Sequence, residues 1–377
     1  MNHDLIRNGE QTLVVKIGSS ILIDENGQTR DEWMLQLVAQ LAQRPGPLVI
    51  VSSGTIGLGR KALGLSGRPS SLAESQAAAA IGQIDLAHTW RTAWARCGRK
   101  AAQVLLTLSD LEDRSRYLNA RDTLETLLER GLVPIVNEND TVATSEIRFG
   151  DNDRLAARTA QLVGAELLVL LSDVDGLYDS DPRTSPDAQR VSEVPVIDAS
   201  IEALAGAAST TGFGTGGMVS KISAARIATA AGCPVLLCSG LGEGDPFEHV
   251  ATKQAGTWFH ATDRPLVQRK QWLRGLQLHD GALLIDSGAV AALQDGASLL
   301  AKGITGYEGE FERGAPVRIQ GPEGPIAQGL SGYSSEEIST IRGEHSDRIE
   351  KILGYAGRGA VIHRDDLVLY ELEENLL

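Results

Sequence analysis

The sequence predicts an α/β protein: an open, mainly parallel sheet covered by helices, followed by a second, smaller β-rich domain. In the first part of the chain, short apolar runs alternate with longer amphipathic stretches, which is the order of strands and helices in a parallel sheet. After residue 262 the pattern changes to short strand candidates separated by Gly, Asp and Pro turns. The length of 377 residues also favours two domains over a single hydrophobic core.

The strands and helices of the first domain follow one another along the chain. Apolar runs predict strands at residues 13–15, 48–51, 104–106, 133–136, 167–171 and 233–238. Helices are predicted at residues 74–96, which are rich in alanine, at 119–130, where apolar residues recur at helical spacing, and at 220–231.

The smaller domain has strand candidates at residues 282–285, 316–319, 326–327 and 361–362. We therefore divide the chain into a first domain over residues 1–265, a linker over 266–279, a β-rich domain over 280–365 and a C-terminal tail over 366–377.

Composition excludes several classes of protein. With 42% hydrophobic and 22% charged residues, the chain is predicted to fold rather than remain disordered. No apolar run is long enough to span a bilayer, and the first residues lack the apolar stretch of a signal peptide, so we expect a cytoplasmic protein without a membrane partner. The net charge of −14 argues against nucleic acid as a partner.

Neither the cysteines nor the histidines form a metal-binding pattern. Cys97, Cys233 and Cys238 are odd in number and lack the close pairing of zinc ligands, which also argues against a disulfide framework. The seven histidines are scattered. Metal ligands are therefore not identified from the sequence.

Glycines and polar side chains follow several of the predicted strands. Lys16, Gly18 and Ser19 follow the first strand, and Ser52, Ser53 and Gly54 follow the second, whereas residues 137–140 and Ser172-Asp173 follow two later ones. Ligands of an open parallel sheet bind beyond the carboxyl ends of its strands. Each segment alone could be an ordinary turn or helix cap, but their shared position predicts a binding site for an oxygen-rich ligand.

A second glycine cluster covers residues 211–221 and leads into a predicted helix. It fails as a dinucleotide fingerprint, because no strand precedes it and no acidic residue follows at the expected distance, and it fails as a Walker A motif, because Lys221 follows Met-Val-Ser instead of Gly. An amide-rich loop at a helix N-terminus followed by a lysine suits a triphosphate, although a surface loop remains an alternative.

Taken together, residues 13–19, 51–54, 137–140, 150–153 and 214–221 resemble the amino acid kinase family. Within it, the resemblance is strongest to members that phosphorylate the side-chain carboxylate of glutamate, and residues 117–124 strengthen it. The β-rich domain, through residues 300–304 and 353–355, resembles a PUA domain.

The resemblance implies ATP and Mg²⁺ as cofactors and assigns residues to three roles. Lys16, Lys221 and Asp153 would be catalytic, with the lysines on the transferring phosphoryl group and Asp153 holding them in position. Ser53, Asp140 and Asn152 would bind L-glutamate. The nucleotide would be bound by Lys16, Gly18, Ser19, Ser172, Asp173, Thr215, Gly216, Gly217, Met218, Val219, Ser220 and Lys221.

The resemblance also implies partners and regulation. We expect a homo-oligomer, either a dimer or a tetramer, feedback inhibition by proline, and delivery of the acyl phosphate to a glutamyl-5-phosphate reductase in proline biosynthesis. Two alternatives stay open: an amino acid kinase that uses acetylglutamate, aspartate or a nucleotide, and an RNA-binding regulatory protein. Residues 280–377 carry 17 acidic residues against eight basic ones, which disfavours RNA binding.

The chemistry predicted for such a site is charge compensation. The acceptor carboxylate has a pKa of about 4.3 in water and is already ionised at neutral pH, so no general base is needed. An anionic oxygen must approach an anionic phosphate, and cations and backbone amides must offset the repulsion. We expect Lys16 and Lys221 to lie on opposite sides of the crevice.

Overall fold

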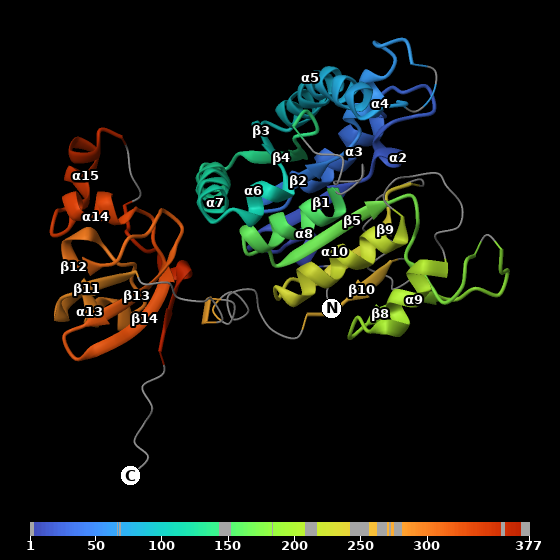
Figure 1. Ribbon diagram of the computed structural model, residues 1–377. Coiled ribbons are helices and arrows are strands. Elements are labelled where there is room, and N and C mark those ends of the chain that lie inside the picture. The colour runs from blue at the N-terminus through green and yellow to red at the C-terminus, as the bar shows by residue number, and fades with distance from the viewer. Residues whose placement is uncertain are drawn as a thin grey trace. The chain divides into compact units, whose positions relative to one another are not determined.

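The computed structural model describes residues 4–65, 67, 69–142, 152–182, 184–207, 217–241, 256–261, 270, 273–274, 281–355 and 359–370. Its contacts divide the chain into two compact units (Figure 1). The first unit consists of residues 1–111 and 120–265, and the second of residues 112–119 and 266–377. Each unit has its own sheet and its own hydrophobic core.

The first unit is built on an eight-stranded sheet. Its strands are ordered β3 (Ala101–Leu106), β4 (Val133–Glu138), β2 (Leu48–Ser52), β1 (Leu13–Ile17), β5 (Leu167–Ser172), β9 (Val235–Ser239), β10 (Thr257–Phe259) and β8 (Glu193–Val194). All pairs from β3 to β9 are parallel, whereas β10 runs antiparallel to β9. The prediction of an open, mainly parallel sheet is therefore confirmed.

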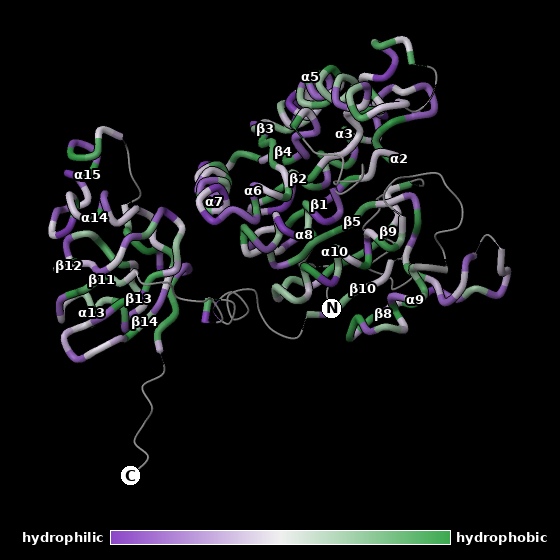
Figure 2. The backbone as a smooth tube through the Cα atoms, viewed as in Figure 1, coloured by the Kyte–Doolittle hydropathy of each residue, from purple (hydrophilic) through white to green (hydrophobic). Residues whose placement is uncertain are grey.

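The central strands are apolar because both faces of the sheet are covered. Every residue of β1, β2, β4 and β5 is buried, and Figure 2 shows hydrophobic residues along β1 and β5. This continuous burial is typical of parallel strands between two layers of helices. A separate two-stranded antiparallel ladder joins β6 (Leu177–Tyr178) to β7 (Arg190–Val191).

Two pairs of long helices contact the sheet. The core on one face includes α3 (Asp31–Leu41) and α5 (Leu72–Arg96), and α8 (Asn152–Leu162) and α10 (Met218–Ala230) lie side by side elsewhere on the sheet (Figure 1). Side chains of a strand alternate between faces. Because Val15 lies in the core with α3 and α5, the next residue, Lys16, faces the opposite side, where α8 contacts β1.

Within the described residues of the first unit and its connections, the other helices are short, except for one of 16 residues. They are α1 (Asp4–Arg7), α2 (Ser19–Leu22), α4 (Thr55–Gly59), α6 (Leu108–Glu112), α7 (Arg114–Glu129) and α9 (Ala199–Ala207). The helices predicted at 74–96, 119–130 and 220–231 correspond to α5, α7 and α10, each of which begins a few residues earlier. For α5 the reason is Ser71, whose hydroxyl accepts the backbone N–H of Glu74 and caps the helix.

The second unit contains the separate β-rich sheet that the sequence predicts. Its strands are ordered β12 (Ile304–Glu308), β11 (Ala282–Ile285), β13 (Pro316–Gly321), β14 (Gly324–Leu330) and β15 (Leu367–Leu369). From residue 281 onward, its described helices are α13 (Ser287–Gln294), α14 (Ser335–Ile341) and α15 (Ser346–Leu353), with short 3-10 helices η2 (Ala301–Gly303) and η3 (Arg364–Asp366).

One strand prediction in the second unit is wrong. Residues 361–362 form no strand, because Ile362 makes only an isolated bridge to Leu299. The chain turns directly into η3, which His363 caps by accepting the N–H of Asp365, and the ladder cannot extend. In the part of the chain that the structure describes, no helix combines the length and apolar character needed to cross a membrane.

Candidate active site

Several parallel strands end at one edge of the sheet. The register pairs Ile17 of β1 with Ser52 of β2 and Leu171 of β5, and it pairs Ser172 of β5 with Ser239 of β9. The carboxyl ends of these strands are therefore level with one another, and this is the edge where open parallel sheets bind their ligands.

Two lysines share one buried carboxylate. The Nζ atom of Lys16, from β1, lies 2.5 Å from Oδ1 of Asp153, and Nζ of Lys221, from α10, lies 3.5 Å from Oδ2. Asp153 is the second residue of α8 and is fully buried, while the two lysine side chains are only 6% and 8% exposed. The packing of α8 against both β1 and α10 brings these three residues together.

The electrostatics of this trio reflect burial and mutual attraction. Burial by itself would raise the pKa of Asp153, but Lys16 and then Lys221 outweigh it, and the pKa of this carboxyl is lowered. The pKa of Lys221 is lowered by burial and by the charge of Lys16, against the opposing charges of Asp153 and Asp173. With both lysines protonated, two ammonium groups face one carboxylate, and the trio carries a net positive charge.

The loop after β1 is tied to the end of β5. The backbone N–H of Gly18 donates to the carbonyl of Leu171 over 3.2 Å. A side chain at Gly18 would begin 3.9 Å from the Lys16 ammonium, so the backbone passes close to that cation. Ser19 follows at the start of α2 and is exposed. Gly18 and Ser19 are therefore accessible beside a lysine, as a phosphate site requires.

A chain of neutral amides lies beside the trio. The side-chain amide of Asn152 donates to Oδ1 of Asn137 over 3.2 Å, and the amide of Asn137 donates to Oε1 of Gln83 over 2.7 Å. These bonds fix the plane of the Asn152 side chain. Its own buried Oδ1 atom has no hydrogen-bond partner among the residues that the structure describes, so it could accept an N–H from a ligand.

Asp140 lies at the same edge, just after β4. The Thr55 hydroxyl donates to its Oδ2 over 3.0 Å. Burial raises the pKa of Asp140, and the hydrogen bond from Thr55 opposes that rise only in part. Beside Asp140 is a cavity of about 220 Å³, which residues such as Gln83 and Leu105 also line. A cationic ligand group would stabilise the ionised form of this carboxyl.

Close contact between two helix backbones sets the position of Thr55. A Cβ atom on Gly82 of α5 would lie 1.9 Å from the carbonyl oxygen of Thr55, and one on Gly59 of α4 would lie 1.9 Å from that of Ala78. Neither glycine can be replaced without separating α4 from α5. Gly54, which precedes α4, has a φ of 113°, a conformation that favours glycine.

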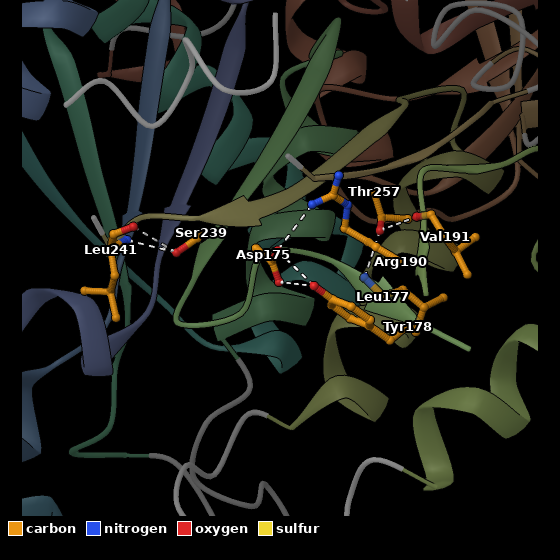
Figure 3. A network of polar contacts seen from close by, with 8 residues as sticks. All are labelled: Asp175, Leu177, Tyr178, Arg190, Val191, Ser239, Leu241 and Thr257. Carbon is orange, nitrogen blue, oxygen red and sulfur yellow. Dashed lines mark hydrogen bonds and ion pairs between the residues drawn. The ribbon is translucent and has the colours of Figure 1, made fainter. Parts of the chain in front are cut away.

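The segment Ser172-Asp173, which is predicted to bind the nucleotide, is fixed by hydrogen bonds where it leaves β5. The hydroxyl of Ser172 donates to Asp173 over 3.0 Å, and the Gly240 N–H donates to the Ser172 carbonyl over 2.8 Å. The Ser239 hydroxyl bonds both the N–H and the carbonyl of Leu241, which stabilises the turn after β9 (Figure 3). Asp173 itself is exposed.

Comparison with known proteins identifies the family. A model of the amino acid kinase family matches residues 11–239. The chain belongs to the amino acid kinase family. A PUA domain model matches residues 281–353 of the second unit.

Relatives of this amino acid kinase cover nearly its whole length. The glutamate 5-kinases of Ruegeria sp. (strain TM1040) and Paramagnetospirillum magneticum are each 50% identical to it over 365 residues, which are 95% of this chain and 98% and 97% of theirs. Among solved structures, T. acidophilum isopentenyl phosphate kinase is 19% identical with a TM-score of 0.44, covering 66% of this chain and 100% of its own.

The structure brings most of the predicted site residues of this amino acid kinase to one edge of the sheet. Lys16, Asp153 and Lys221 make direct contacts. Ser53 follows β2, where its N–H donates to the carbonyl of Ile17 over 3.2 Å. Gly217, Met218, Val219 and Ser220 form the start of α10. Thr215 and Gly216 lie outside the described residues. The functional roles of all these residues stay predictions.

Three supporting residues were not among the predicted site residues. Thr55 orients Asp140, Gln83 orients the Asn137 amide, and Asn137 in turn orients Asn152. Asn137 could have been found, because it lies in the polar segment that follows a predicted strand. Gln83 lies within a long helix and carries no signal in the sequence. Among the described residues, no three His, Cys, Asp or Glu side chains cluster as metal ligands.

Proposed function

We propose that this protein transfers the γ-phosphoryl group of ATP to the side-chain carboxylate of L-glutamate and forms L-glutamyl 5-phosphate. The observation that carries the proposal is the pair of ammonium groups on the single buried carboxylate of Asp153. The choice of glutamate rests on the relatives named glutamate 5-kinase, which are 50% identical over 95% of this chain.

The lysine trio supplies the charge that the reaction needs. In the transfer of a phosphoryl group, negative charge spreads over the equatorial and leaving oxygens, and an anionic nucleophile approaches them. Lys16 and Lys221 offset that charge, and Asp153 keeps both ammonium groups in place without neutralising both of them. No residue is needed to remove a proton from the acceptor, because the carboxylate is ionised at neutral pH.

The amide chain and Asp140 hold the amino acid. The buried Oδ1 of Asn152 accepts an N–H from the α-ammonium group of glutamate, and the Asp140 carboxylate attracts the same cation. The Ser53 hydroxyl donates to a substrate carboxylate. The neutral and acidic groups therefore lie at the amino end of the substrate, and the lysines lie at the end that reacts.

The nucleotide phosphates bind where backbone N–H groups and cations face them. The N–H groups of Met218 and Val219, the first two of α10, have no acceptor within the helix, and the helix dipole adds positive potential there. Gly18, Ser19 and the segment Ser172-Asp173 complete the nucleotide site. ATP would supply the transferable phosphoryl group, and Mg²⁺ bound with it would offset negative charge on the phosphates.

A trapping experiment tests the reaction. The purified protein is incubated with Mg²⁺-ATP, hydroxylamine, and either glutamate, acetylglutamate or aspartate. We expect hydroxamate only from glutamate, and none when EDTA is present. Hydroxamate formed from another acid would mean that the protein is a kinase with a different substrate. Folded protein that gives no product from any acid, but is retained on RNA at physiological salt, would favour the regulatory alternative.

The proposal extends to regulation and partners. Added proline should suppress hydroxamate formation, and a glutamyl-5-phosphate reductase should consume the product without hydroxylamine. We place the reaction in the cytoplasm, where ATP is abundant, and propose that the protein works as a dimer or tetramer. Light scattering on the purified protein measures the assembly, and a monomeric mass in an active sample would contradict that part.

A further inference from the structure

An exposed pair of residues, Asp173 and Val174, projects from the sheet between two anchored positions. On one side the Ser172 carbonyl accepts the Gly240 N–H over 2.8 Å, and on the other the Asp175 carbonyl accepts the Gly256 N–H over 2.9 Å. Both members of the pair are exposed, and 37% of the surface of Val174 is accessible. The pair can hold a defined position only if both anchors are rigid.

Next to the second anchor lies one fully buried hydroxyl, that of Thr257 at the start of β10. It accepts the N–H of Leu177 over 2.8 Å and donates to the carbonyl of Val191 over 2.6 Å (Figure 3). Leu177 lies in β6 and Val191 in β7, and these two residues face each other in the ladder. The single hydroxyl therefore attaches both strands of the β6–β7 pair to the main sheet.

Gly176 connects this hydroxyl to the exposed pair. Its φ is 151°, and a Cβ atom there would lie 2.7 Å from Oγ1 of Thr257 and 2.7 Å from Cδ of Arg190. The backbone at Gly176 thus passes so close to the Thr257 hydroxyl and the Arg190 side chain that no side chain fits between them. Because Leu177, the next residue, donates its N–H to the same hydroxyl, a shift of Thr257 is expected to displace Gly176 and the residues before it.

The side chain of Asp175 adds a second restraint. Tyr178 donates its hydroxyl to both carboxylate oxygens of Asp175 at 3.0 Å, and Nη1 of Arg190 lies 3.2 Å from Oδ2 (Figure 3). The Asp175 side chain is 45% exposed, so solvent weakens this ion pair. The buried Thr257 hydroxyl is the stronger of the two restraints, because water cannot replace its bonds.

We propose that Thr257 is a positioning residue for the nucleotide, which fixes the Ser172-Asp173 segment at the carboxyl edge of the sheet by clamping the β6–β7 pair. The proposal rests on the proposed role of Ser172 and Asp173 in nucleotide binding. Thr257 touches no substrate; it acts through Leu177 and Gly176. Backbone pairing of β10 with β9 and β8 does not involve the hydroxyl and should survive its loss.

The test removes the hydroxyl and keeps the volume. In Thr257→Val, we expect the Kd of the Mg²⁺ complex of AMP-PNP, measured by calorimetry, to rise about tenfold, because small displacements in a site reduce affinity and rate strongly. The KM for ATP should rise in parallel, while the KM for glutamate stays within about twofold. Thr257→Ser, which restores the hydroxyl, should recover the wild-type Kd.

A matched control and a second variant keep the result interpretable. Ser331 in the second unit has a fully buried hydroxyl that donates to the Tyr333 carbonyl over 2.6 Å, and Ser331→Ala should leave the nucleotide Kd unchanged. Should Thr257→Val fail to fold, Arg190→Gln removes the guanidinium from Asp175 and should raise the Kd about twofold to threefold.

Two outcomes overturn the inference. One is an unchanged nucleotide Kd in the folded Thr257 and Arg190 variants. The other is a loss that affects nucleotide Kd, glutamate KM and melting temperature alike, which is the mark of a purely structural role. Because the nucleotide titration needs no acceptor, a wild-type protein that binds nucleotide but does not phosphorylate glutamate would remove the proposed function and leave this inference standing.

Discussion

Two groups of buried or half-buried polar side chains lie at the same edge of the sheet, and they are held in different ways. In the first, Lys16 and Lys221 are charged and are fixed by Asp153. In the second, Gln83, Asn137 and Asn152 are neutral and form a chain of directional hydrogen bonds. A charged group responds to changes of charge in a ligand, whereas a neutral amide chain fixes the direction of one acceptor.

The difference indicates a division of work within the site. Charge on the phosphoryl group changes during transfer, and in the proposed reaction the positive trio faces that change. Charge on the amino end of the substrate stays constant, and groups of fixed geometry are enough there. Variants of the trio should therefore change turnover, and variants around the amide chain should change substrate affinity.

Asp153→Asn should have the largest effect, because it leaves two buried ammonium groups without a carboxylate. Breaking a buried ion pair by removing one partner costs about 3–5 kcal/mol of folding free energy, and turnover should be lost with it. Urea unfolding at pH 7 measures the cost. The control Glu202→Gln removes an exposed ion pair with Arg226 and should cost less than about 1 kcal/mol.

The same variant has a defined pH dependence. The pKa of Asp153 is lowered in the folded protein, so its stabilising contribution is complete above the unfolded value of about 3.9 and is lost as the pH falls through the lower, folded value. The stability difference between wild type and Asp153→Asn should therefore narrow only in acid. If the difference in unfolding free energy between the two proteins narrowed between pH 5 and pH 8, the assigned ion pairs would be contradicted.

Lys221→Met should separate catalysis from stability. The substitution removes one ammonium group, the pKa of which is lowered by burial. It leaves Lys16 paired with Asp153. Turnover should fall about 10²- to 10³-fold, as when a transition-state donor is removed, with the glutamate KM little changed. The unfolding free energy should stay equal or increase. Lys302→Met, on the exposed surface of the second unit, serves as the control.

A loss of glutamate affinity in Lys221→Met with turnover intact would contradict the division of work. It would place Lys221 on the ground-state substrate instead of the transferring group. Steady-state kinetics with glutamate varied at saturating ATP distinguishes these two results.

The sequence predicted much of this edge, because the residues that follow parallel strands gather there whatever the rest of the fold. The motifs identified Lys16, Asp153 and Lys221 as site residues. They did not predict that the three side chains contact one another. That contact depends on Lys16 facing the α8 side of the sheet and on α8 packing against α10. Long-range packing of this kind leaves no local pattern.

Other features had no signal in the sequence for the same reason. The contact between α4 and α5 depends on Gly59 and Gly82, which in the sequence are ordinary helix-weakening residues. Strand β10 has three residues, and its Thr257 hydroxyl matters only because β6 and β7 fold back onto it. The strand predicted at residues 361–362 failed because η3 follows at once.

Asp140→Asn should weaken glutamate binding without weakening the fold. Loss of a charged partner for the substrate ammonium should raise the glutamate KM about tenfold to a hundredfold. Burial raises the pKa of Asp140, so in the wild type glutamate affinity should increase as the pH rises through that raised value. The variant should lose this increase. An unchanged pH profile of the glutamate KM would remove Asp140 from the substrate site.

Gln83→Ala should have the smallest effect, and it tests the contribution of the amide chain alone. It removes the acceptor of the Asn137 amide, which lets Asn137 and then Asn152 rotate. One neutral hydrogen bond corresponds to about a twofold to tenfold change, so the glutamate KM should rise within that range while turnover and the ATP KM stay the same. Asp85→Ala, an exposed residue of α5 outside the lining of the cavity beside Asp140, controls for the change in helix sequence. If Gln83→Ala lowered turnover as strongly as it raised the glutamate KM, the amide chain would also act on the transition state, and the contrast with the lysine trio would fail.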